Sequence, residues 1–190
     1  MKADAEPLGL LLISAQDALS RRVAALLPES IGPARLAKTA REALPILERG
    51  DAELVILAEP VPGDEDQALL PTLLREEKLC LLVITEQLPR PALTERGVLT
   101  LSPAAPDDLL AQSAALLAAT RRKLRRLETK AEKLQARVED LKVINRAKFL
   151  LVQQLRMTEA EAHRYIEKQA MDTCRKRRTI AENIIRTYEA

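Results

Sequence analysis

Short apolar runs alternate with segments of helical spacing over the first 105 residues, and this alternation restricts the fold more than any other feature of the sequence. The apolar runs have the length of buried strands and cover residues 8–14, 35–37, 53–58, 79–85 and 98–101. The segments between them predict helices over residues 16–27, 39–49, 67–77 and 89–97. Strands joined by helical crossovers form a parallel sheet that is covered on both faces. We therefore predict an α/β doubly wound, flavodoxin-like domain over residues 1–105.

A continuous helical pattern begins near Pro106. Apolar residues recur there at spacings of three and four, weakly from Leu110 through Leu117 and then over nearly three clean heptads. The heptad positions, which we call the dimer seam, are Leu124, Leu127, Ala131, Leu134, Val138 and Leu141. So narrow an apolar strip needs a matching strip, which favours a coiled-coil homodimer over residues 106–142. A helix folded back on its own domain is the alternative, and the charges beside the seam do not decide the orientation of a pair.

Residues 143–190 predict an all-α module of three short helices. The first continues the long helix to about Gln154, and a capping box of Thr158 and Glu161 starts the second. The residues expected to face inward on the second helix are Ala162, Tyr165, Ile166 and Ala170. A basic connector over residues 172–178 precedes a third helix, whose apolar residues are Ile180, Ala181, Ile184 and Ile185.

Charge divides the chain into an acidic body and a basic end. Residues 1–120 contain 11 Lys and Arg against 18 Asp and Glu, whereas residues 121–190 contain 19 against 10. A basic end favours a polyanionic partner, because phosphate contacts release counterions from nucleic acid. The chain has only one Phe, two Tyr and no Trp, which argues against base-stacking platforms and favours a folded RNA or a duplex as the target.

The N-terminal pattern resembles the response-regulator receiver family. In that family an acid pair follows the first strand, a phosphoacceptor Asp ends the third, Thr or Ser ends the fourth and Lys-Pro ends the fifth. Thr85 and Pro103 match this pattern, but Ser14-Ala15, Ala58 and Ser102 replace the acid pair, the phosphoacceptor and the lysine. Glu59 comes one residue late, where strand alternation would turn it to the other side. The resemblance therefore implies a pseudo-receiver domain, with Ala58 at the degenerate phosphoacceptor position.

The C-terminal module resembles the ANTAR domain, the RNA-binding module of bacterial transcription antiterminators. The residues that match lie between Val143 and Ile185: Ile144, Ala147-Lys148, Leu150-Leu151, Glu159, Glu161-Ala162, Ile166, Ala170-Met171 and Ile180-Ala181. One departure is Phe149, where the family has Gly or Ala, and we expect it to alter or crowd the local packing.

The candidate RNA-binding residues are chosen from their charge and from this resemblance. They are Lys142, Arg146, Ala147, Lys148, Arg164, Arg175, Lys176, Arg177 and Arg178. Lys148 is the first candidate, because it occupies a heptad position where the seam ends and its charge must leave the interface. His163, the single histidine, is expected to make a polar surface contact.

The resemblance implies a steric function in transcription antitermination. A homodimer would stabilise a two-hairpin form of a nascent leader mRNA and so prevent the terminator hairpin from forming. Without a phosphoacceptor, control would fall to a partner protein such as a ligand-sensing regulator, or the dimer would be constitutive. The rivals are a DNA-binding regulator with a helix-turn-helix and a pure dimeric scaffold. A connector of about six residues argues against the helix-turn-helix, whose turn has three or four.

Several site classes are not indicated by the sequence. No nucleophile–base pair, cofactor motif or metal-ligand spacing is visible, so we expect no enzyme activity, cofactor or metal. Asp64, Glu65 and Asp66 could hold a cation, although a solvated loop is the favoured interpretation. Cys80 and Cys174 lie far apart and are expected to be reduced thiols. With neither a signal-like start nor a long apolar run, we expect a cytoplasmic protein outside the membrane.

Overall fold

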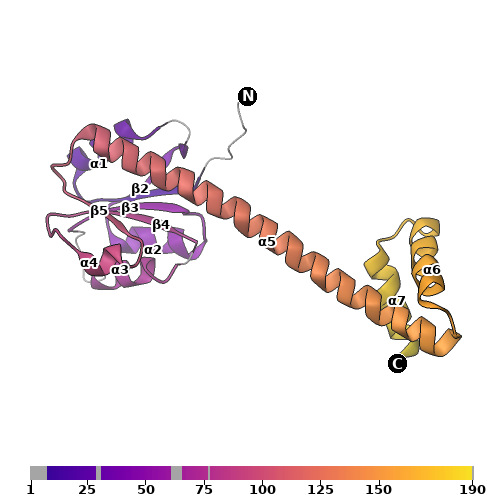
Figure 1. The fold of residues 1–190 in the computed structure, drawn as a ribbon. Helices are drawn as coiled ribbons and strands as arrows, with labels where there is room; N and C mark the ends of the chain where they lie inside the picture. The colour runs from indigo at the N-terminus through magenta and orange to yellow at the C-terminus, as the bar shows by residue number, and fades with distance from the viewer. Residues whose placement is uncertain (1–7, 29–30, 61–65, 77, 190) are drawn as a thin grey trace. The chain divides into compact units, whose positions relative to one another are not determined.

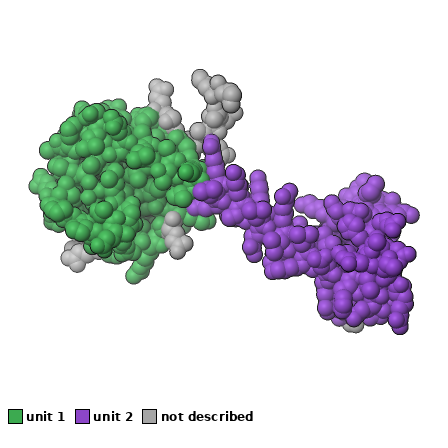
Figure 2. Space-filling view, in the orientation of Figure 1, with its two compact units in different colours: residues 1–125 green, residues 126–190 purple. Residues whose placement is uncertain are grey.

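The computed structural model describes residues 8–28, 31–60, 66–76 and 78–189. The chain divides into two compact units, residues 1–125 and residues 126–190, which Figure 2 colours separately. Asp64 and Glu65, considered above as a cation site, lie outside the described residues, as does the N-terminal segment 1–7. The boundary between the units falls later than the expected 105/106, and the division into three functional segments remains a prediction.

The first unit contains five parallel strands: β1 (Leu10–Ile13), β2 (Ala34–Ala37), β3 (Leu54–Ala58), β4 (Cys80–Ile84) and β5 (Leu99–Leu101). Their order in the sheet is β2-β1-β3-β4-β5, with Leu12 of β1 in register with Leu36 and with Ile56. This is the flavodoxin-like order, and it confirms the predicted fold class. The strands β1, β3 and β4 are buried nearly throughout, as their uninterrupted apolar runs predicted.

Helices cover both faces of this sheet (Figure 1). One face is covered by α1 (Asp17–Leu26) and the start of α5 (Asp107–Leu155). The other is covered by α2 (Ala40–Glu48), α3 (Asp66–Leu73) and the short α4 (Pro91–Thr94). Thr39 caps α2, its hydroxyl oxygen accepting a hydrogen bond from the backbone N–H of Glu42, as the sequence predicted.

The first turns of α5 belong to the core of the first unit. Leu110, Ala114 and Ala118 are buried against the sheet, and Arg121 is buried with a nitrogen 3.4 Å from a carboxylate oxygen of Glu53. The early part of the heptad pattern is therefore covered by the chain's own domain. For these residues the alternative of a helix folded back on its own domain applies. Exposed apolar heptad positions begin at Leu124.

A close backbone approach at the start of β1 requires glycine. A Cβ on Gly9 would lie 1.8 Å from the carbonyl oxygen of Asp51, and the Gly9 carbonyl oxygen accepts hydrogen bonds from the backbone N–H groups of Glu53 and Leu54. We expect Gly9→Ala to separate β1 from β3 and to lower the free energy of unfolding by on the order of 3 kcal/mol. Chemical denaturation of the full chain would measure this loss.

Gly50 is the matched control for that substitution. It has a φ of +68°, and a Cβ at this residue would have no atom within 4 Å of it. Gly50→Ala should therefore cost only backbone strain, about 1 kcal/mol. An equal loss of stability in the two variants would contradict the close approach at Gly9.

Candidate nucleic-acid interface

The second unit ends in three helices that close a small core. The last turns of α5 contribute Ala147 and Leu151, and they pack against α6 (Glu159–Asp172) and α7 (Arg177–Tyr188). The buried residues of the two short helices are Ala162, Ile166, Ala170, Ile180, Ala181 and Ile184. Tyr165, which we expected to face inward, is 39% exposed. The inward face of α6 is formed instead by residues at spacings of four.

A capping box begins α6, as the sequence predicted. The hydroxyl oxygen of Thr158 accepts a hydrogen bond from the backbone N–H of Glu161, and the Glu161 carboxylate accepts one from the Thr158 backbone N–H at 2.8 Å. These bonds to the backbone and the hydroxyl of Thr158 lower the pKa of Glu161. Glu159 in the same turn also has a lowered pKa, because the Lys148 ammonium donates to its carboxylate at 2.8 Å.

Both carboxylates make the second unit sensitive to acid. A carboxyl group whose pKa is lowered on folding stabilises the fold above its unfolded value, near 4.5 here, and loses that contribution as the pH falls through its folded pKa. We expect the melting temperature of the second unit to decrease when the pH is lowered below about 4.5, and to decrease less in Glu161→Gln. Circular dichroism melts between pH 7 and pH 3 would measure this, with exposed Glu132→Gln as the control. An unchanged pH dependence in Glu161→Gln would count against the capping role.

A left-handed residue ends α6. Cys174 has a φ of 51°, its N–H donates to the carbonyl of Met171, and the N–H of Arg175 donates to the carbonyl of Ala170. This is a Schellman cap, a position usually held by glycine. The helix α7 then begins at Arg177, so only residues 173–176 separate the two helices. The expected connector of about six residues is wrong, and the length argument against a helix-turn-helix no longer holds.

Carboxylates hold many of the basic side chains predicted to contact RNA. Lys142 lies 2.8 Å from Glu139, and Arg146 lies 2.5 Å from Glu189. Lys148 is only 16% exposed, and it pairs with Glu159 of α6. At the start of α7, three further pairs form: Arg177 with Glu167, and Arg178 with both Asp140 and Glu182, all at 2.8 Å.

Three of the predicted residues have no such partner. Arg164, Arg175 and Lys176 are exposed, and no carboxylate lies within ion-pair distance of them among residues 126–189. His163, on the exposed surface of α6, lies 3.4 Å from Glu167, in keeping with the polar contact expected for it.

Two residues near the end of α5 differ from their expected roles. Ala147 is fully buried in the three-helix core, so its side chain offers no surface to RNA and its inclusion among the contact residues is wrong. Phe149 is half exposed, so it does not crowd the core, and the Arg146 guanidinium lies 5.9 Å from its ring centre. Tyr188 is also exposed, so all three aromatic residues of the chain lie on the surface of the second unit.

The seam residues form an apolar strip that this single chain leaves uncovered. Leu124, Leu127, Leu134, Val138 and Leu141 are 43–60% exposed, and Ala131 between them is exposed as well. Five large apolar side chains on one helical strip are a feature of an interaction surface.

The residues predicted to form a degenerate phosphorylation site lie at the carboxyl end of the sheet. Ala58, Ser14 and Thr85 are buried there. A cavity of about 430 Å³ is lined by Thr85 together with Gln16, Glu59, Arg90 and Pro103. Glu59 therefore lies beside Thr85, not on the opposite side as expected, because β3 ends at Ala58 and alternation does not extend past it.

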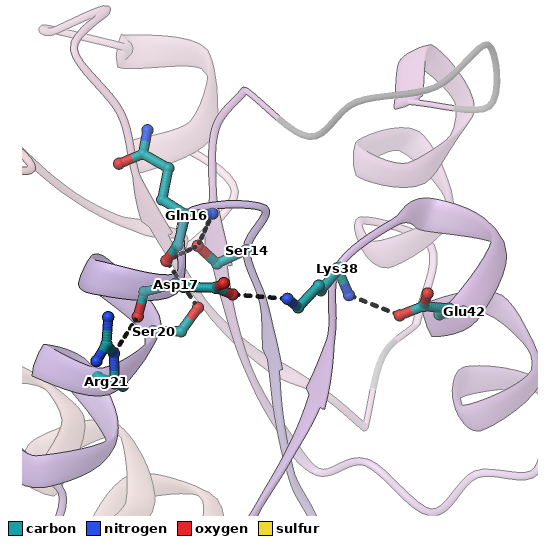
Figure 3. Close-up of polar contacts among 7 residues, drawn as sticks. All are labelled: Ser14, Gln16, Asp17, Ser20, Arg21, Lys38 and Glu42. Carbon is teal, nitrogen blue, oxygen red and sulfur yellow. Dashed lines mark hydrogen bonds and ion pairs between the residues drawn. The ribbon is translucent and has the colours of Figure 1, made fainter.

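Ion pairs occupy this end of the domain. A carboxylate oxygen of Glu59 lies 2.6 Å from the Arg90 guanidinium. Asp17, at the start of α1, pairs with Lys38 at 2.7 Å (Figure 3). This pair lowers the pKa of Asp17 and raises that of Lys38. Within the described ranges, no three His, Cys, Asp or Glu residues form a group suited to a metal ion.

Residues 132–185 match the family model of the ANTAR domain. This segment is an ANTAR domain. The match covers the end of the dimer seam and all three helices of the small core, and it confirms the resemblance drawn from the sequence. A search of curated proteins finds no match.

The fold of the first unit is that of a receiver domain. One similar structure is the signal receiver domain of a putative LuxO repressor protein from Vibrio parahaemolyticus, with a TM-score of 0.54 and 21% identity over 62% of this chain and 94% of that chain. Another is the signal receiver domain of an HD domain-containing protein from Pseudomonas fluorescens Pf-5, with a TM-score of 0.54 and 20% identity over 66% and 96%. At these identities the likeness shows the fold alone. ANTAR and receiver domains are both regulatory families. Among the described helices, none is long and apolar enough to cross a membrane.

Proposed function

We propose that this chain is a cytoplasmic, RNA-binding regulator of transcription antitermination. The observation that carries the proposal is the ANTAR domain at residues 132–185, which coincides with the basic end of the chain. Phosphate contacts from its exposed arginines and lysines would supply the affinity, and no chemical step is needed. The protein would hold a two-hairpin form of a leader mRNA and so exclude the terminator hairpin.

Two copies of the chain would act together in this function. The exposed strip from Leu124 to Leu141 has the heptad spacing of a coiled coil, and a second copy supplies the matching strip. Each ANTAR domain would then bind one hairpin. Because the second hairpin binds within the same complex, the dimer gains affinity through effective concentration without any new contact.

Control of this regulator would not use phosphorylation. Ala58 has no carboxylate to accept a phosphoryl group, and Ser102 replaces the lysine of the family pattern. A ligand-sensing partner protein that sequesters the regulator is the proposed control, and a constitutive dimer is the simpler alternative.

Gel shifts with three probes test the RNA function. The probes are a leader RNA of two adjacent hairpins, its single-hairpin halves, and a duplex DNA of matched length, each over a range of salt. We expect the two-hairpin RNA to bind most tightly. The DNA arm matters because a connector of four residues is compatible with a helix-turn-helix. Equal or tighter binding of DNA would reject the RNA function, and binding to neither would favour a scaffold.

A phosphodonor provides a separate test of the pseudo-receiver interpretation. We expect acetyl phosphate with Mg²⁺ to leave the mass of the intact chain unchanged, because the position of the acceptor is Ala58. Intact-mass spectrometry would measure this, with a phosphorylatable receiver domain as the positive control. A stable phosphoryl adduct within residues 8–125 would overturn the interpretation.

A further inference from the structure

Nine of the basic side chains of the ANTAR domain fall into two sets with different surroundings. The first set is held by carboxylates of the same unit and contains Lys142, Arg146, Lys148, Arg177 and Arg178. The second set lies on α6 and the connector, has no carboxylate within ion-pair distance among residues 126–189, and contains Arg164, Lys168, Arg175 and Lys176. Lys168 was not among the residues chosen from the sequence.

Most of the first set joins one helix to another. Lys148 links α5 to Glu159 of α6, and Arg178 links α7 to Asp140 of α5. Arg177 links α7 to Glu167 of α6. A phosphate that approached one of these cations would meet the partner carboxylate at close range, where like charges repel. These cations are therefore suited to holding the three helices together.

The side chains of the second set lie away from the three-helix core. Arg164, Lys168 and Met171 follow one another at spacings of four and three, which places them on one face of α6. The buried residues Ala162, Ile166 and Ala170 lie on the opposite face. Arg175 and Lys176 lie in the connector that follows α6.

Two exposed apolar residues accompany these cations. Met171 is 77% exposed, and Tyr165 beside Arg164 is 39% exposed although it is a large aromatic residue. The acids nearby are Glu161, which is engaged with Thr158, Glu167, which pairs with Arg177, and Asp172 at the end of the helix. Cations interleaved with an aromatic ring match a nucleic-acid strand, because the cations contact phosphates and the ring stacks on an unpaired base.

We propose that this α6 surface (Arg164, Tyr165, Lys168, Met171, Arg175 and Lys176) binds the RNA hairpin, with Tyr165 stacked on an unpaired loop base and the four cations on phosphates. The carboxylate-held cations, Lys148 among them, support the fold and contribute little to binding. This inference rests on the proposed function and names the surface that performs it. It also revises the expectation that scarce aromatics exclude base stacking.

Salt-dependent binding of the full-length chain separates the two sets of cations. The probe is a fluorescein-labelled RNA of two adjacent hairpins, measured by anisotropy over a range of KCl concentrations. Neutralising the α6 set together (Arg164→Gln, Lys168→Gln, Arg175→Gln and Lys176→Gln) should weaken binding more than 100-fold. The slope of log K against log salt should fall in magnitude by roughly 0.7–0.9 for each phosphate that the variant no longer neutralises. The melting temperature should stay within about 3 °C of wild type, because exposed side chains outside the core and its ion pairs contribute little to stability.

The matched control neutralises cations of the first set. Lys148→Gln with Arg177→Gln should lower the melting temperature and yet, at a temperature where the variant is folded, leave the salt slope unchanged and the affinity within about threefold. Tyr165→Ala should weaken binding about tenfold without changing the salt slope, whereas Tyr165→Phe should bind like wild type.

The outcomes distinguish this inference from the proposed function. If wild-type protein binds the RNA and the α6 variant binds equally well, the inference is wrong while the RNA function stands. The same holds if Lys148→Gln with Arg177→Gln removes the salt slope. If the wild-type chain fails to bind the RNA even at low salt, the proposed function itself fails.

Discussion

Leu134→Lys is expected to convert the proposed dimer into a monomer. Leu134 lies at the centre of the dimer seam and is 60% exposed in the single chain, so in a coiled coil its side chain would fill a pocket formed by the partner helix. A lysine at that position places two ammonium groups near each other in an apolar interface, where an unpaired charge is costly. We expect the dimer dissociation constant to rise by at least about 100-fold, which corresponds to about 2.7 kcal/mol.

Sedimentation velocity across a concentration series would measure this change. The matched control is Ala136→Lys, which adds the same charge two residues away on an exposed position outside the seam. That variant should remain dimeric. A wild-type monomer at high concentration, or a dimer that tolerates Leu134→Lys, would count against the seam.

The same variant links the seam to RNA binding. A monomer should bind a single-hairpin RNA with wild-type affinity but lose the extra affinity for two adjacent hairpins. If Leu134→Lys reduced binding of both probes equally, the dimer would serve a purpose other than joining two hairpin sites.

Ile166→Ala is expected to unfold the ANTAR domain. Ile166 is 1% exposed at the centre of a core that has only eight buried residues. Removing a buried isoleucine side chain to alanine costs about 2–5 kcal/mol, because apolar burial is reduced and a cavity is left behind. A core this small supplies about 3–5 kcal/mol in total, so the loss is comparable to the whole stability of the domain.

Hydrogen exchange with mass spectrometry would locate the effect. Protection should be lost in α6, α7 and the last turns of α5, while β1, β3 and β4 keep wild-type protection. Met171→Ala, on the exposed face of the same helix, should cost less than about 1 kcal/mol. Retained protection of α6 in Ile166→Ala would show that this core is not what stabilises the domain.

Much of the fold followed from residue patterns because each depends on local spacing. The apolar runs placed all five strands, and the capping box at Thr158 placed the start of α6 to the residue. The errors concern residues whose position depends on neighbours far along the chain. Tyr165 and Phe149 were assigned from helical spacing and from family resemblance, yet both lie at the surface because α5 and α6 pack into the small core along other strips of their surfaces.

The contact residues show the same limit. A charge count cannot distinguish a cation that faces solvent from one that a carboxylate has already engaged. Lys148 and Glu159 are eleven residues apart, and Arg178 and Asp140 are 38 apart, so these pairs form only when the helices pack. Lys168 was missed because nothing in its sequence neighbourhood sets it apart from other helical lysines.

The sequence by itself determined the parallel sheet, the heptad strip, the basic ANTAR domain and the lack of a carboxylate at Ala58, because periodicity and residue identity are local properties of the chain. Only the tertiary structure decided where the free seam begins, since Leu110 to Ala118 and Leu124 to Leu141 share one heptad pattern but only the first group meets the sheet. It also decided which cations are free to meet a phosphate, because ion pairing depends on distances in space between charges that are far apart along the chain.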